Sequence, residues 1–238
     1  MTTVSRSERP ASRRSRVTGL LRWALLVGLI GSPTAFAQQP PVHWLHAGAM
    51  PPGAIGSLRL LRGGPLSGYF QPVQIRAPQG ARISLAEEGG FAQSEVDEVL
   101  VGMQIGPVYR LKVTNLPIEL DQELFPTIEI IDRLYPPPGL ALRYPIPIEL
   151  TADELDMGAR GMFVTRVIYL EDPNLALPVQ RQADEQPWVE APRGADPMVV
   201  ADGLGRPVAI LRIGGRVPSS TDPASGCAAP PLIYYGAN

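Results

Sequence analysis

Alternation of apolar and polar residues is clearest in the middle of the chain. Across residues 144–150 every second residue is apolar, and Pro145, Pro147 and Glu149 occupy the other face. This is the pattern of a half-buried strand. Because both prolines lack an N–H group on the same side, one neighbouring strand cannot form a full ladder. The pattern therefore predicts a strand at a sheet edge.

The residues that follow predict a short helix and then a second strand. Thr151 and Glu154 have the capping-box spacing, in which each side chain binds an N–H group at a helix start. Gly161 is suited to end this helix, because a residue without Cβ adopts the left-handed conformation readily. Residues 162–170 are apolar, aromatic or β-branched on both faces, which is typical of a central strand covered on both sides.

Similar short segments recur along the rest of the chain. Asp196 followed by Pro197 predicts a second short helix, and residues 87–98 have the composition of an acidic loop. About eight short strands and one or two short helices predict a single all-β domain, sandwich-like and of Greek-key or immunoglobulin-like type. The remaining strand candidates are residues 57–61, 69–76, 82–86, 99–105, 109–114, 125–134 and 207–213.

The N-terminal residues predict a signal peptide. Several arginines precede the apolar run of residues 23–30, and Ala35-Phe-Ala37 has the small residues of a cleavage site. The run is shorter than the roughly 20 residues that cross a bilayer. We expect residues 1–37 to be removed on export, by the general secretory or the twin-arginine route.

Composition divides the remaining chain into three parts. Residues 38–55 are rich in proline and glycine and predict an extended arm. Residues 56–216 form the predicted sandwich domain, and residues 217–238 predict a disordered tail. Cys227 is the only cysteine, so no internal disulfide forms and packing must stabilise the domain.

The charge balance bears on the class of partner. The 238 residues contain 21 basic and 23 acidic side chains, of which six arginines and Glu8 lie in residues 1–37. The other 201 residues therefore hold 15 basic and 22 acidic side chains, a net charge of −7. A mildly acidic chain argues against nucleic acid or anionic lipid as the partner, because both favour a basic surface.

The arm contains the residues best suited to bind a metal ion. His43 and His46 are the only histidines, and Met50 follows closely. Imidazole and thioether ligands of this kind suit copper. The same residues are also compatible with an incidental surface pair, because no further ligands are nearby to form a rigid site.

Acidic residues near predicted strand ends offer an enzymatic alternative. A glycosidase needs two carboxyl groups about 5 to 9 Å apart, and acids at strand ends are otherwise solvated or paired with arginines. We find no sequence motif for a nucleophilic or nucleotide-binding site, and no cofactor is expected. The candidate acids are Glu119, Asp121, Glu123, Glu129, Asp132, Glu149, Glu171 and Asp172.

Two arginines lie inside otherwise apolar predicted strands. An unpaired charge at Arg166 or Arg212 would be costly in a core, so each is expected to meet a carboxylate or carbonyl groups. Glu129 and Asp132 are the preferred partners. The alternative is that these arginines line a pocket for a carboxylated or sulfated ligand.

Several segments resemble an uncharacterised family of exported proteins from planctomycete bacteria. The resemblance spans about residues 50–217. It implies an envelope or secreted location and carries no activity. The segments that carry it are Gly68-Tyr-Phe-Gln-Pro72, Val108-Tyr-Arg-Leu-Lys-Val113, residues 125–135, residues 163–172 and residues 205–212.

Together these patterns predict a non-catalytic accessory or interaction module of the cell envelope. We expect it to bind an envelope protein or a surface polymer through sheet edges or loops, with no transmembrane anchor after signal cleavage. Pro145 and Pro147 mark the expected edge, and Trp44 marks an apolar contact in the arm. The alternatives are a polysaccharide hydrolase with paired carboxylates and a metal-binding envelope protein.

Overall fold

The computed structural model describes residues 51–88, 90–92, 95–116, 122–174, 188–192, 194–214 and 229–235. The chain divides into two compact units, Met1–Val42 and His43–Asn238. The first unit lies wholly outside the described residues, as do the predicted signal peptide and the arm residues His43, Trp44, His46 and Met50. All of the described residues belong to the second unit.

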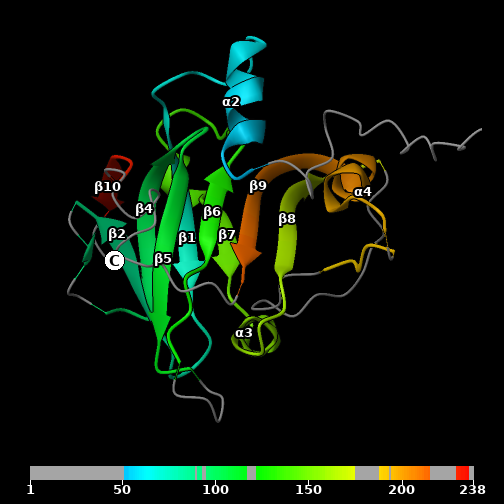
Figure 1. Ribbon diagram of the computed structural model, residues 1–238. Helices are drawn as coiled ribbons and strands as arrows, with labels where there is room; N and C mark the ends of the chain where they lie inside the picture. Colours follow the sequence, from blue (N-terminus) through cyan, green and yellow to red (C-terminus); the bar gives the residue numbers. More distant parts are fainter. Residues whose placement is uncertain are drawn as a thin grey trace, which may run out of the picture. The chain divides into compact units, whose positions relative to one another are not determined.

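The described part of the second unit is mostly β, with two sheets and three short α-helices (Figure 1). In spatial order, one sheet contains β10 (Leu232–Tyr235), β4 (Glu98–Gln104), β1 (Phe70–Arg76) and β7 (Ile146–Glu149). The other contains β3 (Gly90–Phe91), β2 (Arg82–Glu87), β5 (Val108–Thr114), β6 (Thr127–Ile130), β9 (Gly205–Ile213) and β8 (Val164–Glu171). The helices are α2 (Ala54–Leu61), α3 (Ala152–Ala159), α4 (Pro197–Leu204) and the 3-10 helix η1 (Ala141–Arg143).

The β-rich prediction is confirmed in this coarse form, with more strands and helices than expected. Neighbouring strands are antiparallel except for β1 and β7, which run parallel. The two sheets share one hydrophobic core, because Val73, Met103 and Ile148 of the smaller sheet belong to the same buried cluster as Leu111 and Ile128 of the larger. Burial of this apolar surface is the main stabilising contribution.

The strand that contains Pro147 lies at an edge, as its sequence predicts. β7 has one strand neighbour among the described residues, β1, with Ile146 opposite Val73 and Ile148 opposite Ile75. Both isoleucines are buried whereas Pro147 is exposed. The edge position is therefore confirmed, and binding of a partner there stays a prediction.

The prediction of a central strand at residues 162–170 is wrong. β8 is the last strand of the larger sheet and pairs only with β9 among the described strands. Its apolar character on both faces has another cause, since α4 packs against β8 on one side and Ile168 enters the shared core. A strand with apolar residues on both faces is covered on both faces, but it need not have a strand on each side in the sheet.

The predicted strand at residues 57–61 is a helix. α2 begins after Gly53, which has a φ of 87°, and Gly56 donates its N–H to a side-chain oxygen of Glu129 at 2.9 Å. A short apolar run has no period that separates helix from strand, so these tertiary contacts decide its structure. The helix starts at Ala54, two residues before the predicted domain boundary.

The C-terminal tail is ordered where it contains an apolar run. β10 pairs with β4, and Leu232 packs against the shared core. The buried Tyr109 hydroxyl accepts a hydrogen bond from the N–H of Gln104 at 2.7 Å and donates one to the carbonyl of Pro231 at 3.0 Å. The prediction of disorder is therefore wrong for residues 229–235, and residues 217–228 lie outside the described residues.

Two helix starts predicted from the sequence are confirmed. Thr151 Oγ1 accepts the N–H of Glu154 at 3.2 Å, and Glu154 Oε2 accepts the N–H of Thr151 at 3.2 Å. Gly161 follows α3 with a φ of 80°. At α4, Asp196 Oδ1 accepts the N–H of Met198 at 2.9 Å. Local capping therefore fixes both helix starts.

Removal of the α3 cap gives a testable stability change. Thr151→Ala deletes the hydroxyl that accepts the N–H of Glu154, and we expect a loss of about 1 kcal/mol in the free energy of unfolding. Thr151→Ser retains the hydroxyl and should stay within about 0.5 kcal/mol of the parent. Urea denaturation at equilibrium measures both. Equal losses in the two variants would show that the cap does not stabilise α3.

Candidate anion-binding site

Glu129 and Arg212 form an ion pair in the interior of the protein. Arg212 Nη1 lies 2.9 Å from Glu129 Oε2, and Oε1 of the same carboxylate accepts the N–H of Gly56. The exposed fractions of the Arg212 and Glu129 side chains are 6% and 0%. The structure thus brings together two residues that the sequence suggested as partners. The pair joins β6, β9 and the start of α2, and its burial indicates a structural role.

Arg166 pairs elsewhere, and Glu129 and Asp132 are not its partners. Its Nη1 lies 3.3 Å from Glu154 Oε2, and its Nη2 donates to the backbone carbonyl of Glu149. Burial lowers the pKa of the Arg166 guanidinium from its ordinary value, and the charges of Glu154 and Glu149 act in the opposite direction.

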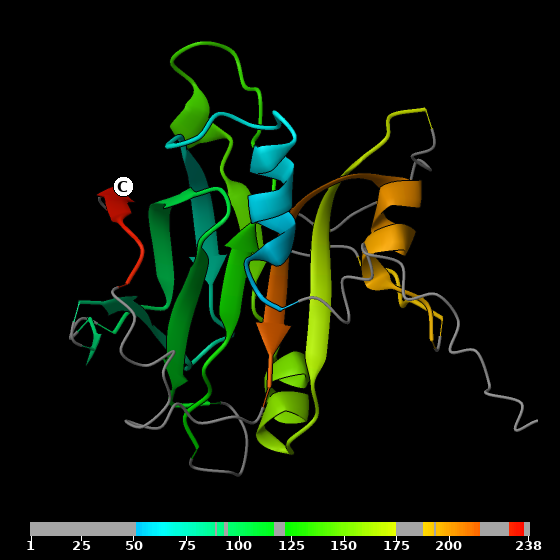
Figure 2. The ribbon, with the colours of Figure 1, turned by 45° about the horizontal axis from the view of Figure 1, so that its top comes forward.

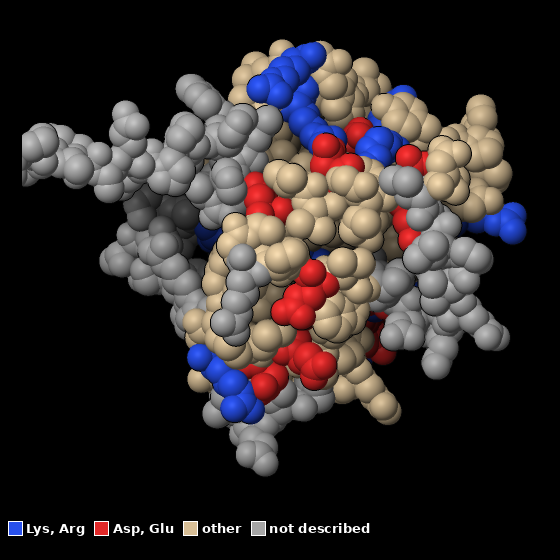
Figure 3. All heavy atoms as spheres, turned by 90° about the vertical axis from the view of Figure 1, so that its right-hand side faces the viewer, with Lys and Arg blue, Asp and Glu red and all other residues tan. Residues whose placement is uncertain are grey.

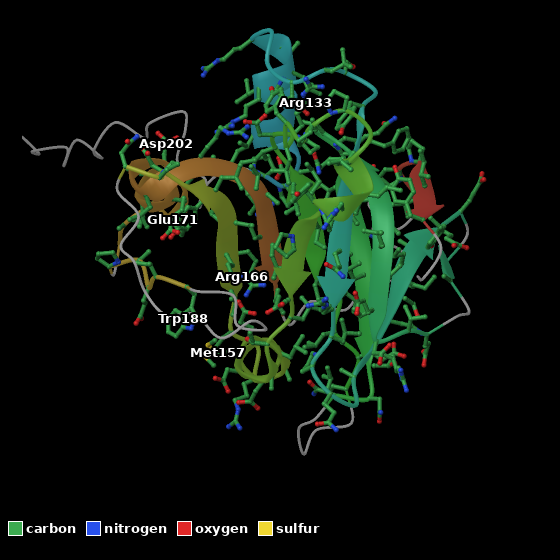
Figure 4. All side chains as sticks on the ribbon, turned by 180° about the vertical axis from the view of Figure 1, so that it is seen from behind. Arg133, Met157, Arg166, Glu171, Trp188 and Asp202 are labelled. Atoms are coloured by element: carbon green, nitrogen blue, oxygen red, sulfur yellow. The ribbon has the colours of Figure 1, made fainter. Side chains whose placement is uncertain are left out.

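The faces of β8 explain this difference. Thr165 lies opposite Arg212 in the β8–β9 pair, so the adjacent Arg166 points to the other face of the sheet. Figure 4 shows Arg166 near the end of β8 that follows α3, the helix that contains Met157. Arg133 lies near the opposite end of the sheets, beside α2. Arg166 and Arg212, for which the sequence suggested the same acidic partners, therefore stabilise different parts of the fold.

Asp132 is the centre of a second, partly exposed group of charges. Arg206 Nη1 lies 2.6 Å from Asp132 Oδ2, and Arg59 Nη1 lies 3.5 Å from the same oxygen. Arg206 also donates to the carbonyl of Arg133 at 3.0 Å, and Arg59 donates to the carbonyl of Pro207 at 3.4 Å. Two guanidinium groups thus converge on one carboxylate.

The Tyr135 ring lies against a third guanidinium, that of Arg133, as well as that of Arg206. Arg133 Cζ lies 4.3 Å from the ring centroid of Tyr135 and 5.3 Å from that of Tyr69. Arg206 Cζ lies 5.3 Å from the Tyr135 ring. These contacts have cation–π geometry. We call Arg59, Asp132, Arg133 and Arg206, with Tyr69 and Tyr135, the arginine–tyrosine cluster.

Backbone hydrogen bonds to two strands hold the cluster in place. The N–H groups of Ile131 and Asp132 both donate to the carbonyl of Val208 in β9, at 2.9 and 3.2 Å. The N–H of Leu134 donates to the buried Gln71 Oε1 of β1 at 2.7 Å. The segment after β6 is therefore fixed between the two sheets, which holds the backbone that carries the cluster's charges.

The cluster is locally basic in a chain that is acidic overall. It contains three arginines and one acid, and Arg133 Nε is buried with no hydrogen-bond partner within the described residues. Figure 3 shows Lys and Arg side chains at the upper end of one face, with acidic side chains directly beside them and over the centre of that face. Planar guanidinium groups in this arrangement suit carboxylate, sulfate or phosphate oxygens.

Three of the acids proposed for hydrolysis have a basic or backbone partner in the described part of the chain. Glu149 Oε1 lies 3.5 Å from Arg76 Nη1, and Glu123 Oε1 lies 3.9 Å from Lys112 Nζ. Asp172 Oδ1 accepts a hydrogen bond from a backbone N–H two residues later. The hydrolase alternative stays a prediction. The remaining candidates are Glu171 at the end of β8, and Glu119 and Asp121 outside the described residues.

The predicted metal ligands and arm contacts have no described structure. His43, Trp44, His46 and Met50 all lie outside the described residues. Across the described ranges, no group of three or more His, Cys, Asp or Glu side chains is positioned to hold a metal ion. The metal-binding alternative stays a prediction.

Five of the six cluster residues were not among the site residues predicted from the sequence: Arg59, Arg133, Arg206, Tyr69 and Tyr135. A signal was nevertheless present. The segments on which the expected family resemblance rests, residues 68–72, 125–135 and 205–212, each contribute at least one residue to the cluster.

No protein-family model, curated protein or solved structure matches the chain. Within the described ranges, no helix combines the length and the apolar character needed to span a membrane. The geometry of the arginine–tyrosine cluster is therefore the basis for a functional proposal.

Proposed function

We propose that the protein is a non-catalytic, exported accessory module of the cell envelope that binds an anionic surface polymer through the arginine–tyrosine cluster. The observation that carries this proposal is that Arg59 and Arg206 converge on a single acid, Asp132, while Arg133 and Arg206 both lie against the Tyr135 ring. The cluster thus contains three guanidinium groups and one carboxylate, and this excess of positive charge attracts an anionic ligand.

The ligand chemistry follows from the side chains. A guanidinium group forms two parallel hydrogen bonds to a carboxylate or sulfate, so acidic sugars are suitable ligands. Tyr135 is 64% exposed and offers an apolar ring face to a sugar ring beside those charges. A polymer presents many copies of such a group, so weak contacts at one site gain strength from repeated rebinding.

The location and the finer fold are part of the proposal. The signal-peptide pattern in residues 1–37 and the family resemblance support export to the envelope. The shared core between the two sheets supports a sandwich-like arrangement of Greek-key or immunoglobulin-like type. A rigid β-scaffold with its binding groups at one end is a common design for recognition modules.

Loss of one cluster arginine is expected to weaken polymer binding. Arg206→Gln removes a charge-assisted contact, and we expect about tenfold weaker binding to polygalacturonate, an effect of roughly 1.5 kcal/mol. Arg160→Gln is the matched control, because Arg160 also pairs with a carboxylate but lies at the end of α3. Biolayer interferometry with immobilised polygalacturonate, heparin and neutral dextran, at increasing salt, measures the affinities.

Several outcomes distinguish the proposal from its alternatives. Binding to the two charged polymers should fall as salt rises, and dextran should not bind. Equal losses for Arg206→Gln and Arg160→Gln would assign the binding to net charge and contradict a local site. If no charged polymer binds, crosslinking of intact cells followed by mass spectrometry tests the alternative of an envelope-protein partner.

A further inference from the structure

Exposed leucines lie in the segments that follow the cluster residues Arg59 and Tyr135 in the chain. Leu61 ends α2 and is 83% exposed, Leu66 in the following turn is 62% exposed, and Leu142 in η1 is 49% exposed. Large apolar side chains at such exposure cost free energy in water unless a partner covers them. Three leucines beside a basic cluster indicate a ligand that is both anionic and apolar.

The two segments that carry these leucines belong to the same end of the sheets. Figures 1 and 2 both show the turn after α2 and the segment between β6 and β7 rising at the end of the sheets from which α2 projects. Contacts agree with this placement: the N–H of Tyr69 donates to the carbonyl of Leu66 at 3.3 Å, and the Tyr69 and Tyr135 rings both lie against Arg133.

The charge at this end differs from that of the whole chain. Arg62 follows Leu61 directly, and Arg143 follows Leu142; both are exposed. With Arg59, Arg133 and Arg206 of the cluster they make five arginines, and the acids beside these include Asp132 and Glu171, which lies opposite Gly205 and next to Arg206. The net charge of −7 in residues 38–238 argues against an anionic lipid partner only if the charged side chains are spread evenly over the surface. The five arginines at this end show that they are not. Leucine beside arginine at a surface is the pattern of an interfacial membrane contact.

We infer that this end of the protein docks on the surface of an anionic lipid bilayer, with the arginines on the headgroups and Leu61, Leu66 and Leu142 in the interfacial layer. The inference rests on the proposed function, because it uses the same arginines, and it adds that the polymer is bound where it is anchored to lipid. Tyrosine suits such a position, since its ring has an apolar body and a polar hydroxyl.

Vesicle binding tests the inference. The processed protein, purified after export, is sedimented with vesicles of phosphatidylcholine alone or mixed in equal parts with phosphatidylglycerol. We expect binding to the anionic vesicles, about tenfold weaker in the double variant Leu61→Ser/Leu142→Ser, and little binding to the neutral vesicles. The matched control Met162→Ser/Phe163→Ser removes exposed apolar side chains from the segment between α3 and β8 and should bind like the parent.

The outcomes separate this inference from the proposed function. Binding to polygalacturonate without binding to anionic vesicles would overturn the lipid inference and leave the proposed function intact. Equal vesicle affinity of the Leu61/Leu142 variant and the parent would also overturn it, because the contact would then be purely electrostatic. Absence of binding to both polymer and vesicles would overturn both proposals.

Discussion

Replacing Glu129 by alanine is expected to lower the free energy of unfolding by about 3–5 kcal/mol. The substitution leaves the guanidinium of Arg212 buried without its carboxylate, from which it is 2.9 Å away in the native structure. It also leaves the N–H of Gly56 without its acceptor, so α2 loses an anchor at its first turn. Equilibrium denaturation in urea measures the loss, and an unchanged slope of the transition would show that folding remains two-state.

The double variant Glu129→Met/Arg212→Met is the informative control. Removing both charges avoids an unpaired buried ion, and such replacements are often close to neutral. Here the recovery should be incomplete by about 1–3 kcal/mol, because the buried N–H of Gly56 still lacks an acceptor. A double variant as unstable as Glu129→Ala would contradict the view that the unpaired charge dominates the loss.

Local signals in the sequence predicted the elements whose structure is decided locally. The capping residues Thr151 and Asp196 fix their own helix starts through side-chain hydrogen bonds within three residues. Pro145 and Pro147 limit strand pairing through their missing N–H groups, and β7 lies at an edge. In each case the physical cause lies inside the segment, so a single sequence contains it.

Elements decided by tertiary contacts were not predictable in the same way. Residues 57–61 form a helix because Gly53 and Glu129 shape its start, and residues 232–235 form a strand because β4 offers them an edge. The partner of Arg166 depends on which face of β8 it occupies, and that depends on the register with β9. None of these contacts leaves a periodic pattern in the sequence.

The arginine–tyrosine cluster shows the same limit at the level of a site. Arg206 and Asp132 are 74 residues apart in the chain, and Arg59 comes from a helix that the sequence pattern suggested was a strand. The sequence suggested Asp132 as a partner of Arg166 or Arg212, whereas it pairs with Arg206 and Arg59. The hydrogen bonds that hold residues 131–132 against Val208 decide which arginines Asp132 can reach.

Gly56→Ala is expected to destabilise the protein by about 1–3 kcal/mol and to weaken polymer binding. Helix propensity alone predicts the opposite, since alanine stabilises a helix by about 1 kcal/mol relative to glycine. We expect the steric clash to outweigh the gain in helix propensity, because a Cβ at Gly56 would lie 2.7 Å from Gly106 Cα and 3.1 Å from the carbonyl oxygen of Ile130. These are backbone atoms that cannot move aside, so α2 must shift.

Gly203→Ala is the matched control for this prediction. Gly203 also lies in a short helix, α4, but a Cβ there would meet nothing within 4 Å, so the propensity gain of up to about 1 kcal/mol should appear. Arg59 lies one turn after Gly56 and reaches Asp132 at 3.5 Å, so a shift of α2 should also lower the affinity for polygalacturonate. Loss of stability with unchanged affinity would show that the position of α2 does not matter to the site, whereas loss of both would tie the buried helix contact to ligand binding.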